Sequence, residues 1–170
     1  MKTYSNRNGF TLLEVVAILV ILGIITALAI SQLSSSQNNL IAATDTLTSH
    51  LRLAQARAMN TSAATVSVWG VNFTSPTQYY LFYCAAASSC TTPANNKVAF
   101  PGAGSVDITP TGGVQVTNGA LVLAFDRFGT PYTNATLTTI LAAQLTITLK
   151  DKNNNTRTIN ITPQTGMIKS

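Results

Sequence analysis

The sequence predicts an α+β protein in which one long N-terminal helix packs against an antiparallel β-sheet head. Three observations favour this class. Residues 10–30 form an almost uncharged apolar run, apolar residues then recur at helical spacing up to about residue 60, and beyond residue 62 apolar and polar residues alternate. A spacing near 3.6 residues is typical of a helix with one buried face, whereas a spacing of two is typical of half-buried strands.

The composition argues against several functional classes. Charged residues make up 9% of the 170 residues, compared with about 25% in an average domain, which fits neither a disordered chain nor a coiled coil. The net charge of +5 comes from scattered residues, without the basic stripe of a dedicated nucleic-acid binder. The chain has one histidine and two cysteines, so it has few of the side chains that bind metals or transfer protons in catalysis. We therefore expect no enzyme activity, no metal and no cofactor.

The apolar run at residues 10–30 is long enough to cross a bilayer, because a helix rises about 1.5 Å per residue and the run spans roughly 31 Å. Its only charged residue is Glu14, and Lys2 and Arg7 precede it. Two interpretations are a secretory signal peptide cleaved after Ala29 and a plain single-pass anchor. Neither accounts for Glu14, since a charge within an apolar span costs a few kcal/mol and is expected to have a partner.

A third interpretation comes from the hexapeptide GFTLLE at residues 9–14. It resembles the leader junction of type IV prepilins and type II secretion pseudopilins. In that family a prepilin peptidase cuts after the glycine, here Gly9, and N-methylates the new first residue, here Phe10. The resemblance places Glu14 at the fifth mature position, where it implies pairing with the Phe10 amine of a neighbouring subunit. Such a pair would replace a lone charge in the membrane by a paired one in a filament core.

The resemblance also implies a domain layout, a location and a set of partners. The layout is a leader at residues 1–9, a transmembrane or filament-core helix at 10–33 and a periplasmic head at 34–170. The location is the bacterial inner membrane, crossed once, with the head in the periplasm or on an extracellular filament. The partners are the peptidase/methyltransferase, other pilins or pseudopilins, and an inner-membrane assembly platform.

The head is expected to begin with the second half of the helix. An apolar stripe at helical spacing indicates the face that packs on a sheet; its members are Leu40, Leu47, Leu51, Ala54 and Ala58. No proline occurs before Pro76, so the helix is expected to run unbroken to about residue 60. His50 flanks the stripe, and we expect it to be a solvated or interface residue.

Seven segments of the head are predicted strands, because their apolar residues alternate or their composition is β-prone. They are residues 64–71, 78–84, 97–100, 114–117, 120–126, 144–150 and 156–162. The last two alternate most cleanly and are expected to form a hairpin. The strands are expected to form one antiparallel sheet or a pair of sheets.

Cys84 and Cys90 are separated by five residues. If the head lies outside the cytoplasm, a disulfide between them is the expected outcome. Two reduced thiols remain the alternative.

Three segments of the head resemble the GspH/FimT family of minor pilins and pseudopilins. They are LRLAQARAMN at residues 51–60, FDRFG at 125–129 and TGMIK at 165–169. In the second segment we expect Phe125 to be a core residue, Asp126 to cap a turn and Gly129 to have a positive φ. The implied function is that of a minor subunit of a type II secretion pseudopilus or a type IV pilus.

Nucleic acid stays open as an alternative partner. Some FimT-like minor pilins take up DNA through basic residues near a C-terminal Gly-Arg-x-Arg, but residues 166–169 here are GMIK. The candidate DNA contacts are therefore other cations expected near the last hairpin, namely Lys150, Lys152, Arg157 and Lys169. Phosphate binding needs several such cations together, and DNA binding is not the favoured function.

Overall fold

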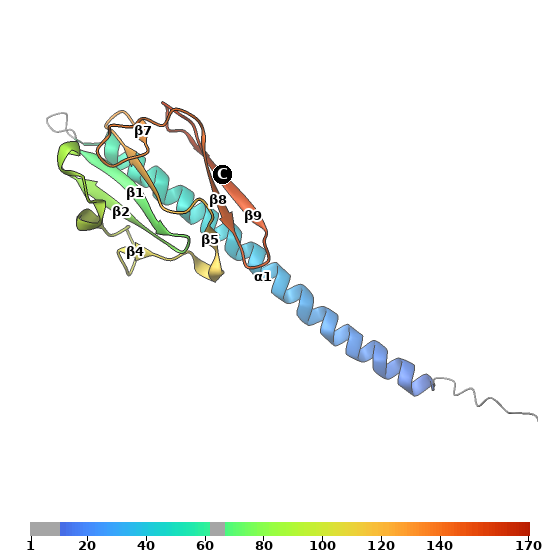
Figure 1. The fold of residues 1–170 in the computed structure, drawn as a ribbon. Helices are drawn as coiled ribbons and strands as arrows, with labels where there is room; N and C mark the ends of the chain where they lie inside the picture. Colours follow the sequence, from blue (N-terminus) through green and yellow to red (C-terminus); the bar gives the residue numbers. More distant parts are fainter. Residues whose placement is uncertain (1–10, 62–66) are drawn as a thin grey trace, which may run out of the picture. The chain divides into compact units, whose positions relative to one another are not determined.

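The computed structural model describes residues 11–61 and 67–170, and within its first helix the side chains of residues 27–34 are not described. The predicted leader at residues 1–9, which ends with Gly9, and the predicted first mature residue, Phe10, lie outside these residues. The chain divides into two compact units, residues 1–35 and residues 36–170. Helix α1 (Leu12–Met59) is followed by ten strands and three short 3-10 helices in the described residues (Figure 1).

Helix α1 runs without a break from Leu12 to Met59, which agrees with the absence of proline. Its start is capped by Thr11, whose Oγ1 accepts a hydrogen bond from the backbone N–H of Glu14 at 3.3 Å. A threonine oxygen at this position satisfies one of the N–H groups that a helix start leaves unpaired. At the other end, Arg57 lies in the last turn, where a cation interacts favourably with the helix dipole.

The first sheet is antiparallel and has the order β3-β2-β1-β6-β7, with β4 also pairing with β2. In its centre Val71 on β1 lies opposite Leu81 on β2 and Leu123 on β6. The strands are β1 (Val68–Ser75), β2 (Gln78–Cys84), β3 (Lys97–Val98), β4 (Asp107–Ile108), β6 (Leu121–Phe125) and β7 (Pro131–Tyr132). The 3-10 helices η1 (Ala87–Ser89), η2 (Pro93–Asn96) and η3 (Thr111–Gly113) lie in the connections.

The second sheet has the order β10-β9-β8-β5. Its strands are β5 (Gln115–Val116), β8 (Leu145–Lys150), β9 (Thr156–Ile161) and β10 (Ile168–Lys169). The predicted hairpin is confirmed, since β8 and β9 pair antiparallel along their whole length, with Ile147 opposite Ile159. Because side chains alternate along a strand, Ile147, Ile159 and Ile161 share one buried face.

Both sheets pack along the second half of α1, as Figure 1 shows. The five residues of the predicted stripe are all buried and belong to one core cluster with residues from both sheets, such as Phe73 of β1 and Leu149 of β8. A second, smaller cluster covers the other face of the first sheet and includes Phe82 and Tyr80. The predicted α+β class is therefore confirmed, with a pair of sheets rather than one.

The strand predictions differ from the structure in the bounds of two strands and in the absence of several short ones. The first strand was expected at residues 64–71 but runs from Val68 to Ser75, and residues 64–66 lie outside the described part. The expected strand at residues 97–100 is reduced to Lys97–Val98. Strands β4, β7 and β10 are not among the seven predicted strands, because each has two residues and so is too short to show alternation.

Candidate functional site

The N-terminal part of α1 exposes apolar side chains on every side of the helix. Residues 18–22 alone complete more than one turn, and all five are exposed apolar side chains. Soluble monomers rarely expose a contiguous apolar patch larger than a few hundred Å². This surface therefore suits burial by lipid or by other chains. Its large residues are Leu12, Leu13, Val15, Val16, Ile18, Leu19, Val20, Ile21, Leu22, Ile24 and Ile25.

Glu14 lies in the first turn of α1 and is exposed. Its backbone N–H donates to the Thr11 carbonyl at 3.1 Å as well as to the hydroxyl. Its carboxylate has no hydrogen bond or ion pair with any residue in the ranges 11–61 and 67–170. The helix dipole favours a negative charge at this end. The spacing T-x-x-E is that of a capping box, a local signal that the sequence interpretation of Glu14 missed.

The predicted membrane span covers residues 10–33. Phe10 and the side chains of residues 27–33 lie outside the described part of this span. In the part of the chain that the structure describes, no helix combines the length and the apolar character needed to cross a bilayer.

Three segments that are far apart in the sequence meet at the Gln55 side chain. Its Nε2 donates to the carbonyl oxygen of Gly129 at 3.0 Å and to that of Gly166 at 3.1 Å. The two glycines have φ values of +77° and +63°, a region that side chains disfavour. A Cβ on Gly166 would lie 2.4 Å from the Gly129 oxygen and 2.5 Å from Gln55 Nε2. We call Gln55, Gly129 and Gly166 the Gln55 junction.

The turn at residues 125–129 has the predicted structure. Phe125 is buried, and Asp126 Oδ1 accepts hydrogen bonds from the backbone N–H groups of Phe128 and Thr130, both at 2.9 Å. The positive φ of Gly129 closes the turn. These roles are structural, and they bring Gly129 to the helix.

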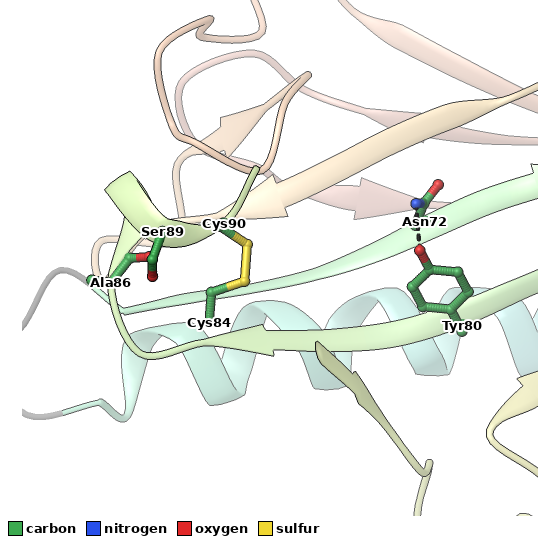
Figure 2. Close-up of a disulfide and its surroundings, with 6 residues drawn as sticks. All are labelled: Asn72, Tyr80, Cys84, Ala86, Ser89 and Cys90. Carbon is green, nitrogen blue, oxygen red and sulfur yellow. Dashed lines mark hydrogen bonds between the residues drawn. A yellow bond between two sulfur atoms is a disulfide. The ribbon is translucent and has the colours of Figure 1, made fainter. Parts of the chain in front are cut away.

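Cys84 and Cys90 are joined by a disulfide, with 5.6 Å between their Cα atoms. Figure 2 shows the bond closing the short loop that carries η1, where the Ser89 hydroxyl donates to the Ala86 carbonyl at 2.9 Å. Both cysteines are buried in the cluster on the outer face of the first sheet. On the same sheet Asn72 Nδ2 donates to the Tyr80 hydroxyl at 2.7 Å. The disulfide therefore holds the end of β2 against this cluster.

His50 packs between α1 and the first sheet instead of being solvated. Its ring stacks on Phe100 with 3.8 Å between the ring centres, and its Nδ1 lies 2.9 Å from the Tyr79 hydroxyl. Burial lowers the pKa of His50 below 6.5 and raises the pKa of Tyr79. The contact therefore joins a neutral imidazole to a protonated phenol, and the tautomer of His50 decides which of the two groups donates. Within the described ranges, no three His, Cys, Asp or Glu residues lie close enough to hold a metal ion.

Asp151 ties the β8–β9 turn to the helix. Its Oδ2 accepts a hydrogen bond from Ser36 Oγ at 2.8 Å, and its Oδ1 accepts the N–H groups of Asn153 and Asn155. Desolvation favours the neutral carboxyl, but the hydrogen bonds from the Asn155 side chain, Ser36 and the turn outweigh it and lower the pKa of Asp151. Ser36 and Asp151 are both buried but lie 115 residues apart in the sequence, so this contact was not visible in the local sequence.

The four candidate DNA-binding cations do not share one face of the last hairpin. Lys150 pairs with Thr156, and Lys169 pairs with Asn160, so both lie on the face opposite to the buried isoleucines of β9. Arg157 alternates to the other face and lines a pocket together with Gln37 of α1. Lys152 lies in the turn. The structure therefore divides these cations between two faces and a turn.

Comparison with known families gives one match. The model of the prokaryotic N-terminal methylation motif matches residues 4–30. The matched residues span the predicted leader junction and the apolar run, and the motif indicates a type IV pilin-type protein that is processed as a prepilin. Processing by a prepilin peptidase and assembly with other pilins follow from the motif. No curated protein and no solved structure matches the chain.

Proposed function

We propose that the chain is a minor pilin or pseudopilin of the GspH/FimT kind, with a pilin-like fold. In this proposal it is cut between Gly9 and Phe10, N-methylated on Phe10, anchored in the inner membrane through residues 10–33, and then incorporated into a pseudopilus or type IV pilus. The chain performs no catalysis of its own. It is the substrate of the peptidase/methyltransferase and a building block of the filament.

The observation that carries the proposal is the combination of the methylation motif with the helix that follows it. The motif covers residues 4–30, and α1 continues without interruption to Met59 inside the head. Cleavage after Gly9 leaves the exposed apolar side chains of residues 12–25 attached to the head, whereas cleavage after Ala29 would remove them. Retention is useful only if another apolar surface covers these side chains.

The finer assignment to the GspH/FimT kind is supported by the Gln55 junction. The three segments that resemble this family supply one residue each to the junction, namely Gln55, Gly129 and Gly166. A shared structural role gives a physical reason for the three segments to occur together. The cations at the last hairpin give no comparable support for DNA uptake.

The experiment that tests processing is mass spectrometry of the mature N-terminus after expression with a prepilin peptidase. We expect a chain that begins with N-methylated Phe10. A Gly9→Leu variant, which removes the small residue before the cut, should keep its full leader. A mature chain that begins at Ile30 would refute the proposal, because the apolar helix would then have been removed.

The role of Glu14 is tested by assembly. In Glu14→Val we expect membrane insertion and processing to persist while incorporation into filaments fails, since the neighbour's Phe10 amine loses its partner. The matched control is Thr26→Val on the same helix, because the Thr26 hydroxyl already donates to the Leu22 carbonyl at 2.7 Å and needs no partner in another chain. Incorporation is measured by cross-linking of sheared filaments. If both variants are incorporated equally well, Glu14 has no pairing role in assembly.

A further inference from the structure

Strand β9 has one edge that the sheet covers only in part. On one side β9 pairs with β8 over its whole length. On the other side β10 pairs only with Asn160 and Ile161. In the described part of the chain, no strand pairs with residues 156–158 on this second side. An unpaired edge of this kind presents N–H and C=O groups with which another extended chain can pair.

Two backbone hydrogen bonds determine which residues of β9 point to the open side. The N–H of Thr162 donates to the Met167 carbonyl at 3.0 Å, so Thr162 points toward β10. The Asn155 carbonyl accepts the N–H of the first residue after β8 at 3.0 Å, so Asn155 points toward β8. Because these directions alternate along an antiparallel strand, Thr156 and Thr158 point to the open side. The open edge therefore offers N–H donors and C=O acceptors from both threonines.

Two pockets, with volumes of about 570 and 280 Å³, lie along this edge between β9 and α1. Arg157 lines both of them, and we call the two together the β9 groove. Thr156 and Thr158 each line one pocket, although their side chains alternate to the face opposite the buried isoleucines of β9. The β9 groove therefore reaches around the edge of the strand instead of lying beneath its face. Helix α1 contributes Gln37, Leu40, Ile41 and Thr44 to the lining.

The charge at the β9 groove is positive. Arg157 is exposed, and its side chain has no ion pair or hydrogen bond with residues 11–61 or 67–170. Asp151, the nearest acidic residue in the sequence, is 4% exposed and already accepts hydrogen bonds from Ser36 and the β8–β9 turn. Asp45 follows Thr44 on α1 but lines neither pocket. A guanidinium without an ion pair beside an open edge favours a carboxylate on the chain that pairs there.

Two other occupants fit the open edge less well. If the same edge of a second copy paired with it, symmetry about Arg157 would place the two Arg157 side chains directly opposite each other. Like charges in that position destabilise a sheet. The phosphates of a nucleic acid are also disfavoured, because they only accept hydrogen bonds and would leave the C=O groups of the edge unpaired. A polypeptide strand has both donors and acceptors.

We propose that the β9 groove binds an extended segment of a partner polypeptide, which pairs as an additional strand with Thr156 and Thr158 and places a Glu or Asp side chain against Arg157. In this mode of recognition, main-chain hydrogen bonds provide affinity and alternate side chains provide specificity. A side chain directly opposite Arg157 shares its face of the sheet, so the acidic residue lies on the α1 side. On that side Leu40 and Ile41 provide apolar surface for its neighbours two positions away.

The test uses the peptide Ac-Val-Thr-Glu-Thr-Val-amide on the full isotope-labelled chain in detergent micelles. Binding is followed by the amide chemical shifts of Thr156 and Thr158. The central Glu is designed to face Arg157, and the two threonines of the peptide are designed to pair with the two edge threonines. We expect shifts of both amides that saturate at millimolar peptide. No saturable shift would overturn the proposal and leave Arg157 as a charge that only protects an open edge.

Two altered peptides separate the backbone from the charge. N-methylation of both peptide threonines removes the N–H groups that pair with the edge, so we expect saturable binding to be lost. Replacement of the Glu by Lys puts like charges opposite each other, and we expect about fivefold weaker binding. Unchanged binding of the N-methylated peptide would refute strand pairing, and unchanged binding of the Lys peptide would refute the selection for an acidic residue.

Two variants locate the charge effect. Arg157→Gln changes an exposed side chain, so it should fold normally and should bind the Glu and Lys peptides equally. Arg127→Gln is the matched control, because it removes a cation that lines neither pocket and should keep the fivefold preference. A preference retained in Arg157→Gln, or lost in Arg127→Gln, would contradict the proposed pairing.

Two further titrations test the disfavoured occupants. Shifts of the Thr156 and Thr158 amides that grow with protein concentration alone would show that a second copy occupies the edge. Shifts with a DNA duplex, together with none for the Glu peptide, would show that a nucleic acid binds there. Either result would overturn the proposal, whereas we expect neither titration to move these two amides.

Discussion

Replacing Gly166 by alanine should destabilise the head more than the same change at a glycine with open surroundings. Gly166 has a φ of +63°, which costs an alanine roughly 1–2 kcal/mol. In addition, the new Cβ would lie 2.4 Å from the Gly129 oxygen and 2.5 Å from Gln55 Nε2. Relieving these contacts separates Gln55 from its two carbonyl partners, and two lost hydrogen bonds add about 2 kcal/mol. The total expected loss is about 3–4 kcal/mol.

Gly119→Ala is the matched control for this prediction. Gly119 has a φ of +73°, but nothing lies within 4 Å of its added Cβ, so only the backbone cost of roughly 1–2 kcal/mol remains. The free energy of unfolding is measured by urea denaturation of the full chain in micelles, with the fluorescence of Trp69 as the probe. A difference of about 2 kcal/mol between the variants is expected. Equal losses would show that the Gln55 junction does not hold these segments together.

Three further predictions follow from the core, the disulfide and the histidine. Leu51→Ala should lower the free energy of unfolding by about 2–5 kcal/mol, because Leu51 is fully buried under the sheets. Leu53→Ala, which changes a half-buried side chain, should lower it by less in the same urea assay. The double variant Cys84→Ser, Cys90→Ser should lose roughly 2 kcal/mol, since the bond closes a short loop; a wild-type midpoint unaffected by reductant would contradict this. Because burial lowers the pKa of His50, the unfolded chain binds the proton first, so stability should fall as the pH drops below about 6.5. His50→Gln should abolish this pH dependence of the stability. If the variant keeps the wild-type pH profile, another group causes the dependence.

The sequence predicted those parts of the fold that have a period. The stripe from Leu40 to Ala58 and the alternation in β8 and β9 identified the helix face and the hairpin, because burial of one face imposes a repeat on the residues. Strands β4 and β7 have two residues each, which is too few for a repeat. Pairing with β2 and β6 decides where they form. Such pairing between segments cannot be seen in a short stretch of sequence.

The candidate sites also differ in whether consecutive residues or distant residues form them. A leader junction is a linear segment, so the motif at residues 4–30 is readable from consecutive residues. The Gln55 junction joins positions that are 74 and 111 residues apart, and the Ser36–Asp151 bond spans 115 residues. The separate motifs around Gln55, Gly129 and Gly166 were visible in the sequence, but their contact was not, because it depends on how the sheets pack on α1.

The two parts of α1 differ in how their apolar residues are spaced, and this difference determines what can cover them. Between residues 40 and 58 the buried positions recur at helical spacing, so one sheet surface on one side is sufficient. Between residues 15 and 25 consecutive positions are apolar and exposed, so no single flat surface covers them all. Only an environment that surrounds the helix, either lipid or several neighbouring helices, removes that area from water. A polar substitution should therefore be harmful on any face of this part, whereas between residues 40 and 58 it should be harmful on one face only.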